Sequence, residues 1–235
     1  MAIPAHRAAL VGTRLALSGA VLYLLEWVAI IAIPAQAPSQ PGTPAAQVLA
    51  DYAGHADGLA LWAGWFSIVL IGRVLFVIGV RTSLARSGRS HPLIDLAVAA
   101  MSLSVALEIA AYALAAAAGQ LAEEGNTVAT VTLDRAAMML NLTIAGPLSV
   151  AILCTVIAMW KSGLFPRSLV VVGLLAGLPV LVASLLIGPD FVALMRGLSF
   201  GVFIFWIWML WTGVLLWFRT PKRVPDGDSA VRQAT

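Results

Sequence analysis

Three charged side chains, Glu26, Arg73 and Glu108, lie inside long apolar stretches of this sequence. A charge near the centre of a membrane-spanning helix costs at least about 2.5–3.5 kcal/mol, so each of the three needs a partner or a function. Counted at about 1.5 Å per helical residue, the two glutamates lie at a similar level, about 3–4 Å outside the midplane of their spans. Arg73 lies on the inner side of the midplane, from where its long side chain can reach a carboxylate or extend to the membrane surface.

Each glutamate has a tyrosine on the same helical face. Tyr23 precedes Glu26 by three residues, and Tyr112 follows Glu108 by four. Residues three or four apart lie one above the other on a helix, so both tyrosines are expected to orient the carboxyl groups.

The other polar and aromatic candidates lie in the fourth and sixth apolar stretches. Asn141 adds an amide at the level of the glutamates, and the sixth stretch carries tryptophans through its middle. Tryptophan usually lies at membrane interfaces, so tryptophans at mid-depth point to an aromatic wall. The predicted substrate-binding residues are Tyr23, Arg73, Tyr112, Asn141, Trp206 and Trp208.

These residues favour acid–base chemistry on a lipophilic molecule. Two carboxyl groups in one apolar site cannot both carry a charge at low cost, so one is expected to hold a proton. A protonated carboxyl beside aromatic rings can protonate an alkene or polyene, and the ring faces then stabilise the cation. This is the chemistry of a metal-free isomerase or proton-initiated cyclase of a prenyl or polyene lipid. We assign Glu108 as the predicted acid and Glu26 as its partner or base.

Other functions fit the same residues. A small proton-coupled transporter or a ligand-sensing membrane protein would use the glutamates as a proton relay, with hinges at Pro147 and Pro179. In a purely structural role, Arg73 would neutralise one glutamate while the other stays protonated. A non-catalytic membrane partner would have a filled bundle and would bind another protein through its inner loops.

The residue types exclude several kinds of site. The histidines, at positions 6, 55 and 91, lie in loops or at helix ends, which argues against an intramembrane haem or zinc site. Cys154 is the only cysteine, so no disulfide framework can form within the chain. Neither a Gly-x-Ser-x-Gly elbow nor an aspartate-rich motif for Mg²⁺ and a diphosphate is present. The sequence therefore predicts no metal and no cofactor.

The helices that position these residues follow from the composition. Of the 235 residues, 61% are hydrophobic and 11% are charged, with a mean hydropathy of +0.96. A soluble domain is about 45–50% apolar and about 25% charged, so we predict an all-α, polytopic membrane helix bundle. A crossing helix needs about 20 mostly apolar residues, and six stretches qualify. They are residues 15–33, 59–80, 93–118, 136–160, 168–187 and 197–218.

The basic residues predict the orientation of the bundle. With a cytoplasmic N-terminus, all of the 14 Lys and Arg residues except Arg73, Arg135 and Arg196 fall on the cytoplasmic side. This asymmetry matches the positive-inside rule, so both termini are predicted to be cytoplasmic. The pI of about 9.5 is then explained by topology and not by nucleic-acid binding. Residues 1–219 form the predicted transmembrane domain, and residues 220–235 a disordered cytoplasmic tail.

Small residues at helical spacing predict close helix packing. The fifth and sixth stretches contain Gly173-x-x-x-Gly177 and Gly197-x-x-x-Gly201. Such spacing lets helix backbones approach each other, so these faces are candidate contacts for a homo-oligomer.

A turn after the fourth stretch resembles a known group of proteins. Residues 162–169 read Ser-Gly-Leu-Phe-Pro-Arg-Ser-Leu and lead into the glycine-rich fifth stretch. In this turn and in the spacing of the spans, residues 10–218 resemble a large family of uncharacterised bacterial six-helix integral membrane proteins, which carry a Ser-Gly-x-x-Pro-Arg-x-Leu turn after helix four. The resemblance implies the six-helix fold and the bacterial cytoplasmic (inner) membrane. It implies no activity.

Overall fold

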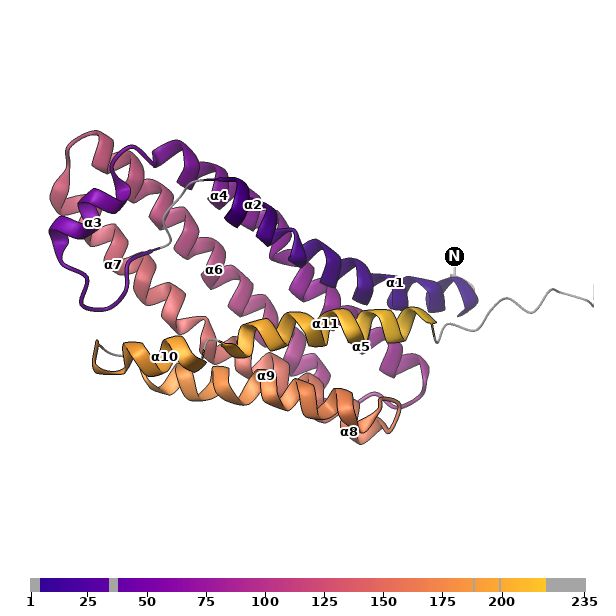
Figure 1. Cartoon of the computed structure of the whole chain (residues 1–235). Helices are drawn as coiled ribbons and strands as arrows, with labels where there is room; N and C mark the ends of the chain where they lie inside the picture. The colour runs from indigo at the N-terminus through magenta and orange to yellow at the C-terminus, as the bar shows by residue number, and fades with distance from the viewer. Residues whose placement is uncertain (1–4, 34–37, 188, 199, 219–235) are drawn as a thin grey trace, which may run out of the picture.

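The chain folds into a bundle of long apolar helices. The computed structural model describes residues 5–33, 38–187, 189–198 and 200–218, and the predicted tail, 220–235, lies outside them (Figure 1). Within the described residues all regular structure is helical, and six units are long and apolar enough to cross a membrane. The predicted all-α, six-span fold is therefore confirmed. The units are Arg14–Ala32, Ala56–Arg86, Leu93–Glu123, Thr127–Ser162, Arg167–Leu185 and Phe200–Phe218.

Three spans consist of two helices that meet at a single residue. Leu25 separates α1 from α2, Leu70 separates α4 from α5, and Ile144 separates α7 from α8. At the last junction, Pro147 has no N–H to donate to the carbonyl of Thr143, which weakens the helix there. The helices are α1 (Ala5–Leu24), α2 (Glu26–Ala32), α3 (Ala45–Tyr52), α4 (Ala56–Val69), α5 (Ile71–Arg86), α6 (Leu93–Glu123), α7 (Thr127–Thr143), α8 (Ala145–Ser162), α9 (Arg167–Leu185), the 3₁₀ turn η1 (Pro189–Phe191), α10 (Val192–Leu198) and α11 (Phe200–Phe218).

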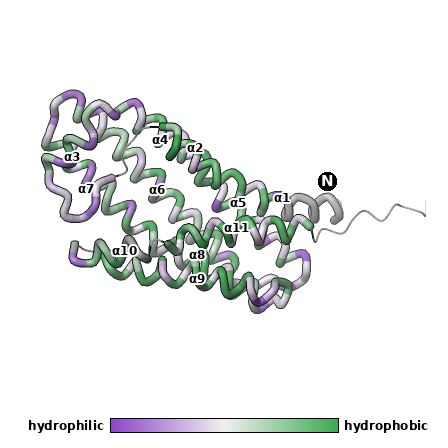
Figure 2. Tube along the Cα trace, in the orientation of Figure 1, coloured by the Kyte–Doolittle hydropathy of each residue, from purple (hydrophilic) through white to green (hydrophobic). Residues whose placement is uncertain are grey.

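The distribution of hydropathy along the bundle fits a membrane-spanning protein. Figure 2 shows hydrophobic helix centres and hydrophilic segments gathered at the two ends. α1 packs against α5 and α11, α6 packs against α4, α7 and α8, and α9 packs against α8 and α11. Which end faces the cytoplasm stays a prediction.

Two helices extend further than the sequence predicted. The predicted span 93–118 ends too early, because α6 continues to Glu123. The predicted span 136–160 begins too late, because α7 already starts at Thr127. The Asn126 side chain accepts a hydrogen bond from the N–H of Ala129 (3.2 Å), which caps α7. At the other end of the chain, the predicted sixth span, 197–218, is divided between α10 and α11.

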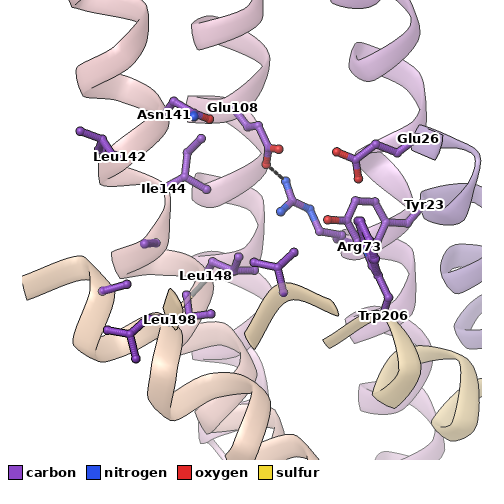
Figure 3. Close-up of a pocket in the computed structure, with 14 residues that line it drawn as sticks. Tyr23, Glu26, Arg73, Glu108, Asn141, Leu142, Ile144, Leu148, Leu198 and Trp206 are labelled. Carbon is purple, nitrogen blue, oxygen red and sulfur yellow. Dashed lines mark hydrogen bonds and ion pairs between the residues drawn. The ribbon is translucent and has the colours of Figure 1, made fainter. Parts of the chain in front are cut away.

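A close approach of α1 and α5 holds the first two spans together. A Cβ atom on Gly19 would lie 2.5 Å from the carbonyl oxygen of Gly72 and 2.5 Å from the backbone nitrogen of Phe76. No side chain fits in this space, so only glycine permits the two backbones to come so near. Near this contact, Glu26 at the start of α2 and Arg73 on α5 face the same space between the helices (Figure 3).

Three of the four glycines in the Gly-x-x-x-Gly motifs pack inside the bundle. Gly173 packs against Trp208, Gly177 packs against Leu153 of α8, and Gly201 packs against α9. These contacts account for both glycines of the fifth span and for Gly201, whereas a Cβ atom on Gly197 would meet open space. A homo-oligomer formed through the same helices stays a prediction.

Candidate functional site

One cavity brings most of the predicted site residues together. It has a volume of about 320 Å³, near the lower end of the roughly 300–1,000 Å³ that is usual for small-molecule pockets. Its remaining walls are mainly aliphatic and come from α7, α8, α9, α10 and α11. The predicted residues that line it are Tyr23, Glu26, Arg73, Glu108, Asn141 and Trp206 (Figure 3). We name this space the acid cavity.

A buried ion pair crosses the acid cavity. The Arg73 guanidinium donates a hydrogen bond through Nη2 to Oε2 of Glu108, and both side chains are buried. The guanidinium also lies over the ring of Tyr23, with its central carbon 5.0 Å from the ring centroid. A cation over an aromatic face is stabilised by the ring quadrupole, so Tyr23 and Glu108 together compensate the charge of Arg73.

Glu26 is the acid of this cavity that forms no ion pair within the described residues. Its side chain is buried, and among the described residues Oε2 has no hydrogen-bond partner. Figure 3 shows the guanidinium between the two carboxyl groups, with its hydrogen bond directed to Glu108. Two carboxyl groups thus lie near one cation. The Oε2 atom of Glu26 can hold a proton or interact with a charged or polar group of a ligand.

The chain positions Glu26 through the interruption between α1 and α2. The carbonyl oxygen of Leu25 accepts hydrogen bonds from Nε1 of Trp65 (2.8 Å) and from the N–H of Val28 (3.1 Å). Trp65, on α4, therefore fixes the residue that immediately precedes Glu26. This role could not be predicted, because Trp65 is one of several aromatic residues in an apolar span.

An aromatic wall stands beside Glu26. Trp206 packs edge-on against Tyr23 (5.8 Å between centroids) and against Trp27 (4.7 Å). Trp27 in turn contacts Phe203, one helical turn before Trp206 on α11 (5.9 Å). Trp27 was missed in the sequence, although its position next to Glu26 was a usable signal.

Two predicted site residues lie elsewhere. Tyr112 stacks on Phe66 of α4 (4.3 Å between centroids, 24° between planes), because α6 packs against α4 on this side. Trp208 is fully buried and contacts Phe76 of α5 (5.3 Å). It follows Trp206 by two residues, or roughly 200° around the helix, so the two rings cannot face the same cavity. Neither Tyr112 nor Trp208 lines the acid cavity.

A third buried acid, Asp134, was missed because it lies outside the predicted fourth span. It is fully buried on α7 and accepts hydrogen bonds from the Ser39 N–H (2.9 Å), the Ser39 hydroxyl and the Tyr52 hydroxyl (3.0 Å). Next to it, Arg135 donates to the carbonyl oxygen of Thr43. Burial, followed by the charge of Asp134, raises the pKa of Tyr52 above its ordinary value. We name Ser39, Tyr52 and Asp134 the outer acid cluster.

Comparison with protein-family models, with curated proteins and with solved structures finds no match for this chain. The family resemblance of the turn at residues 162–169 therefore stays a prediction. In the part of the chain that the structure describes, no group of three or more His, Cys, Asp or Glu side chains gathers to hold a metal ion.

Proposed function

We propose that this protein binds a lipophilic ligand in the acid cavity and exchanges a proton with it through Glu26. The observation that carries the proposal is Oε2 of Glu26, which has no hydrogen-bond partner among the described residues and lies beside an ion pair that already occupies Arg73. A buried carboxyl with no cation of its own is least costly when it is neutral, so Glu26 holds the exchangeable proton. The mainly aliphatic walls then select an apolar molecule.

In its most concrete form the proposed activity is a metal-free isomerisation or cyclisation of a prenyl or polyene lipid. The sequence alone favoured Glu108 as the acid. Its hydrogen bond to Arg73 instead supports Glu108 as the fixed carboxylate and Glu26 as the acid. The cavity volume of about 320 Å³ suits a short prenyl chain or one end of a longer polyene.

The proposed reaction balances without an oxidant or a reductant. The O–H bond of Glu26 breaks, and the π electrons of an alkene form a new C–H bond with its proton. The neighbouring carbon becomes a cation, which the rings of Tyr23 and Trp206 stabilise. In an isomerase, a proton from an adjacent carbon returns to the Glu26 carboxylate and the double bond is shifted. In a cyclase, a second alkene first attacks the cation and forms a C–C bond.

A proton-coupled transporter is the second candidate, and one observation favours it. The acid cavity is lined by Leu148 and Val180, which directly follow Pro147 and Pro179. A proline inside a span weakens the helix, and interrupted helices at a central site are typical of transporters. In this function Glu26 would release its proton when a ligand binds.

A binding experiment tests the feature that both candidates share. The probes are a long-chain tertiary amine, which carries a positive charge like the proposed cation, and the alcohol of equal chain length. The wild-type protein in neutral detergent is expected to bind the amine more tightly, and Glu26→Gln should remove the difference. Glu124→Gln, an exposed glutamate, is the matched control. Equal binding of both probes by the wild type would overturn the proposal.

Isotope incorporation then separates the two candidates. The protein is incubated in D₂O with a sesquiterpene alcohol, and the recovered lipid is analysed by mass spectrometry. An isomerase or cyclase introduces deuterium into C–H positions in a manner that depends on Glu26. A transporter leaves the lipid unlabelled, and in proteoliposomes the amine drives proton movement that Glu26→Gln abolishes. If neither signal is observed, both activities are rejected.

A further inference from the structure

A second hollow lies on the outside of the bundle, between α8 and α9. It has a volume of about 330 Å³ and shares no lining residue with the acid cavity. Its walls are almost entirely apolar and include Val156 of α8 and Val170, Val171 and Leu174 of α9, while Trp160 and Arg167 stand at one end. We name it the α8–α9 groove.

Positive charge gathers at that end of the groove. Lys161 lies next to Trp160, with its Nζ 5.4 Å from the Trp160 ring centroid, and Arg167 begins α9. In the described residues neither Lys161 nor Arg167 forms an ion pair, whereas Arg81 on the same end of the bundle pairs with Asp95 (2.5 Å). Two basic side chains beside an apolar surface therefore have no acidic partner among the described residues.

The groove is charged at one end and apolar along the rest of its length, as a bilayer lipid is, and it runs from the end of the bundle toward its middle. From Arg167 to Leu174 the α9 wall rises by about 10 Å, which leads from the polar end of the bundle into its apolar middle (Figure 2). Trp160 is 61% exposed at the polar end, where interfacial tryptophans are typically found. The first turn of α9 adds the positive end of a helix dipole at the same place.

We propose that the α8–α9 groove binds one anionic phospholipid of the surrounding bilayer. Its phosphate lies between Lys161, Arg167 and the first turn of α9, and one acyl chain occupies the space between Val156 and Val171. Charge complementarity selects this occupant, because a neutral lipid would leave both cations without a counter-ion. Basic pockets between spans are a recurrent mode of anionic lipid recognition. The inference is independent of the proposed function.

Lipid titration of the full-length protein in neutral detergent, followed by native mass spectrometry, tests the site. The wild type is expected to retain one phosphatidylglycerol at concentrations where phosphatidylcholine is lost. In Lys161→Gln/Arg167→Gln the apparent affinity for phosphatidylglycerol should fall about 30-fold, the factor for two basic side chains near a membrane surface. Arg14→Gln/Arg81→Gln removes two positive charges elsewhere and should leave the affinity unchanged.

A substitution in the apolar part provides an independent test. Val171→Trp fills the groove without changing any charge and should also reduce phosphatidylglycerol retention. Glycerol 3-phosphate, which has the phosphate without acyl chains, should not compete. The proposal is overturned if phosphatidylcholine binds as tightly as phosphatidylglycerol, if both double variants lose the lipid equally, if Val171→Trp retains it fully, or if glycerol phosphate displaces it.

Discussion

The outer acid cluster and the acid cavity bury the same chemical group in opposite ways. Asp134 is fully buried and accepts three hydrogen bonds, two from Ser39 and one from Tyr52. Glu26 is 7% exposed, yet its Oε2 has no hydrogen-bond partner in the described chain. A buried carboxyl that is fully hydrogen-bonded holds structure together, whereas one that lacks partners beside a cavity remains available for a ligand.

The packing around the two acids differs in the same way. Tyr52 belongs to a small apolar cluster, which also contains Val48, Leu59 and Ala137 and joins α3 to the outer parts of α4, α6 and α7. Glu26 instead borders a space of about 320 Å³. The hydrogen-bonded Asp134 thus lies in a densely packed region, whereas Glu26, whose Oε2 has no partner among the described residues, borders a cavity. Substitutions can test this association.

The largest effect on stability is expected at Glu108, which is the satisfied acid of the acid cavity. Glu108→Gln leaves the guanidinium of Arg73 buried without its ion pair, and breaking such a pair costs about 3–5 kcal/mol. Unfolding in mixed micelles of neutral detergent and sodium dodecyl sulfate measures the loss. The double variant Arg73→Met/Glu108→Leu removes both charges and should recover most of the stability. A single variant as stable as the wild type would show that the pair does not hold the spans together.

The next effect is expected in the outer acid cluster. Asp134→Ala removes the acceptor of three donors, and unpaired buried polar groups cost about 1–3 kcal/mol each unless water reaches them. Release of residues 38–52 from α7 would expose the donors to water, so we expect a loss of about 1–3 kcal/mol and faster proteolysis within that segment. Asp134→Asn keeps one acceptor oxygen and should have the smaller effect. Unchanged proteolysis in Asp134→Ala would contradict the structural role of this acid.

The charged residues of the acid cavity could be predicted from the sequence more readily than the contacts that position them. Glu26, Arg73 and Glu108 could be identified because a charge in an apolar span stands out against its neighbours. Asp134 could not, because its neighbours are polar and only the outward extension of α7 buries it. Trp208 could have been excluded from the wall by helical geometry alone, since it lies on the opposite side of α11 from Trp206.

The approach of α1 and α5 could not be predicted either. The sequence drew attention to glycines spaced four residues apart in one span, but the close backbone contact of α1 with α5 joins Gly19 to Gly72. Such a contact depends on two glycines in different spans and on their depths in the bundle. Periodicity within one span contains no information about that pairing.

A smaller effect, which depends on pH, is expected at Tyr52. Tyr52→Phe removes one hydrogen bond to Asp134 and should cost about 1 kcal/mol at neutral pH. Because the pKa of Tyr52 is raised in the folded chain, its contribution to stability is complete below the ordinary tyrosine pKa, about 10, and decreases at higher pH. The unfolding temperatures of wild type and Tyr52→Phe should therefore converge above about pH 10. Parallel curves would show that the hydroxyl does not stabilise the cluster in its neutral form.

The smallest effect on stability is expected at Glu26, and this expectation separates the two kinds of buried acid most clearly. Glu26→Gln replaces one neutral polar group by another, because the carboxyl already holds a proton in the proposed function. It breaks no hydrogen bond to Oε2, so the free energy of unfolding should change by less than about 0.5 kcal/mol. Unfolding in the same mixed micelles measures the change, with Glu108→Gln as the contrast. A loss similar to that of Glu108→Gln would mean that Glu26 carries a charge shared with Arg73. The acid cavity would then be a three-membered structural network like the outer acid cluster, and it would contain no carboxyl that is free to exchange a proton with a ligand.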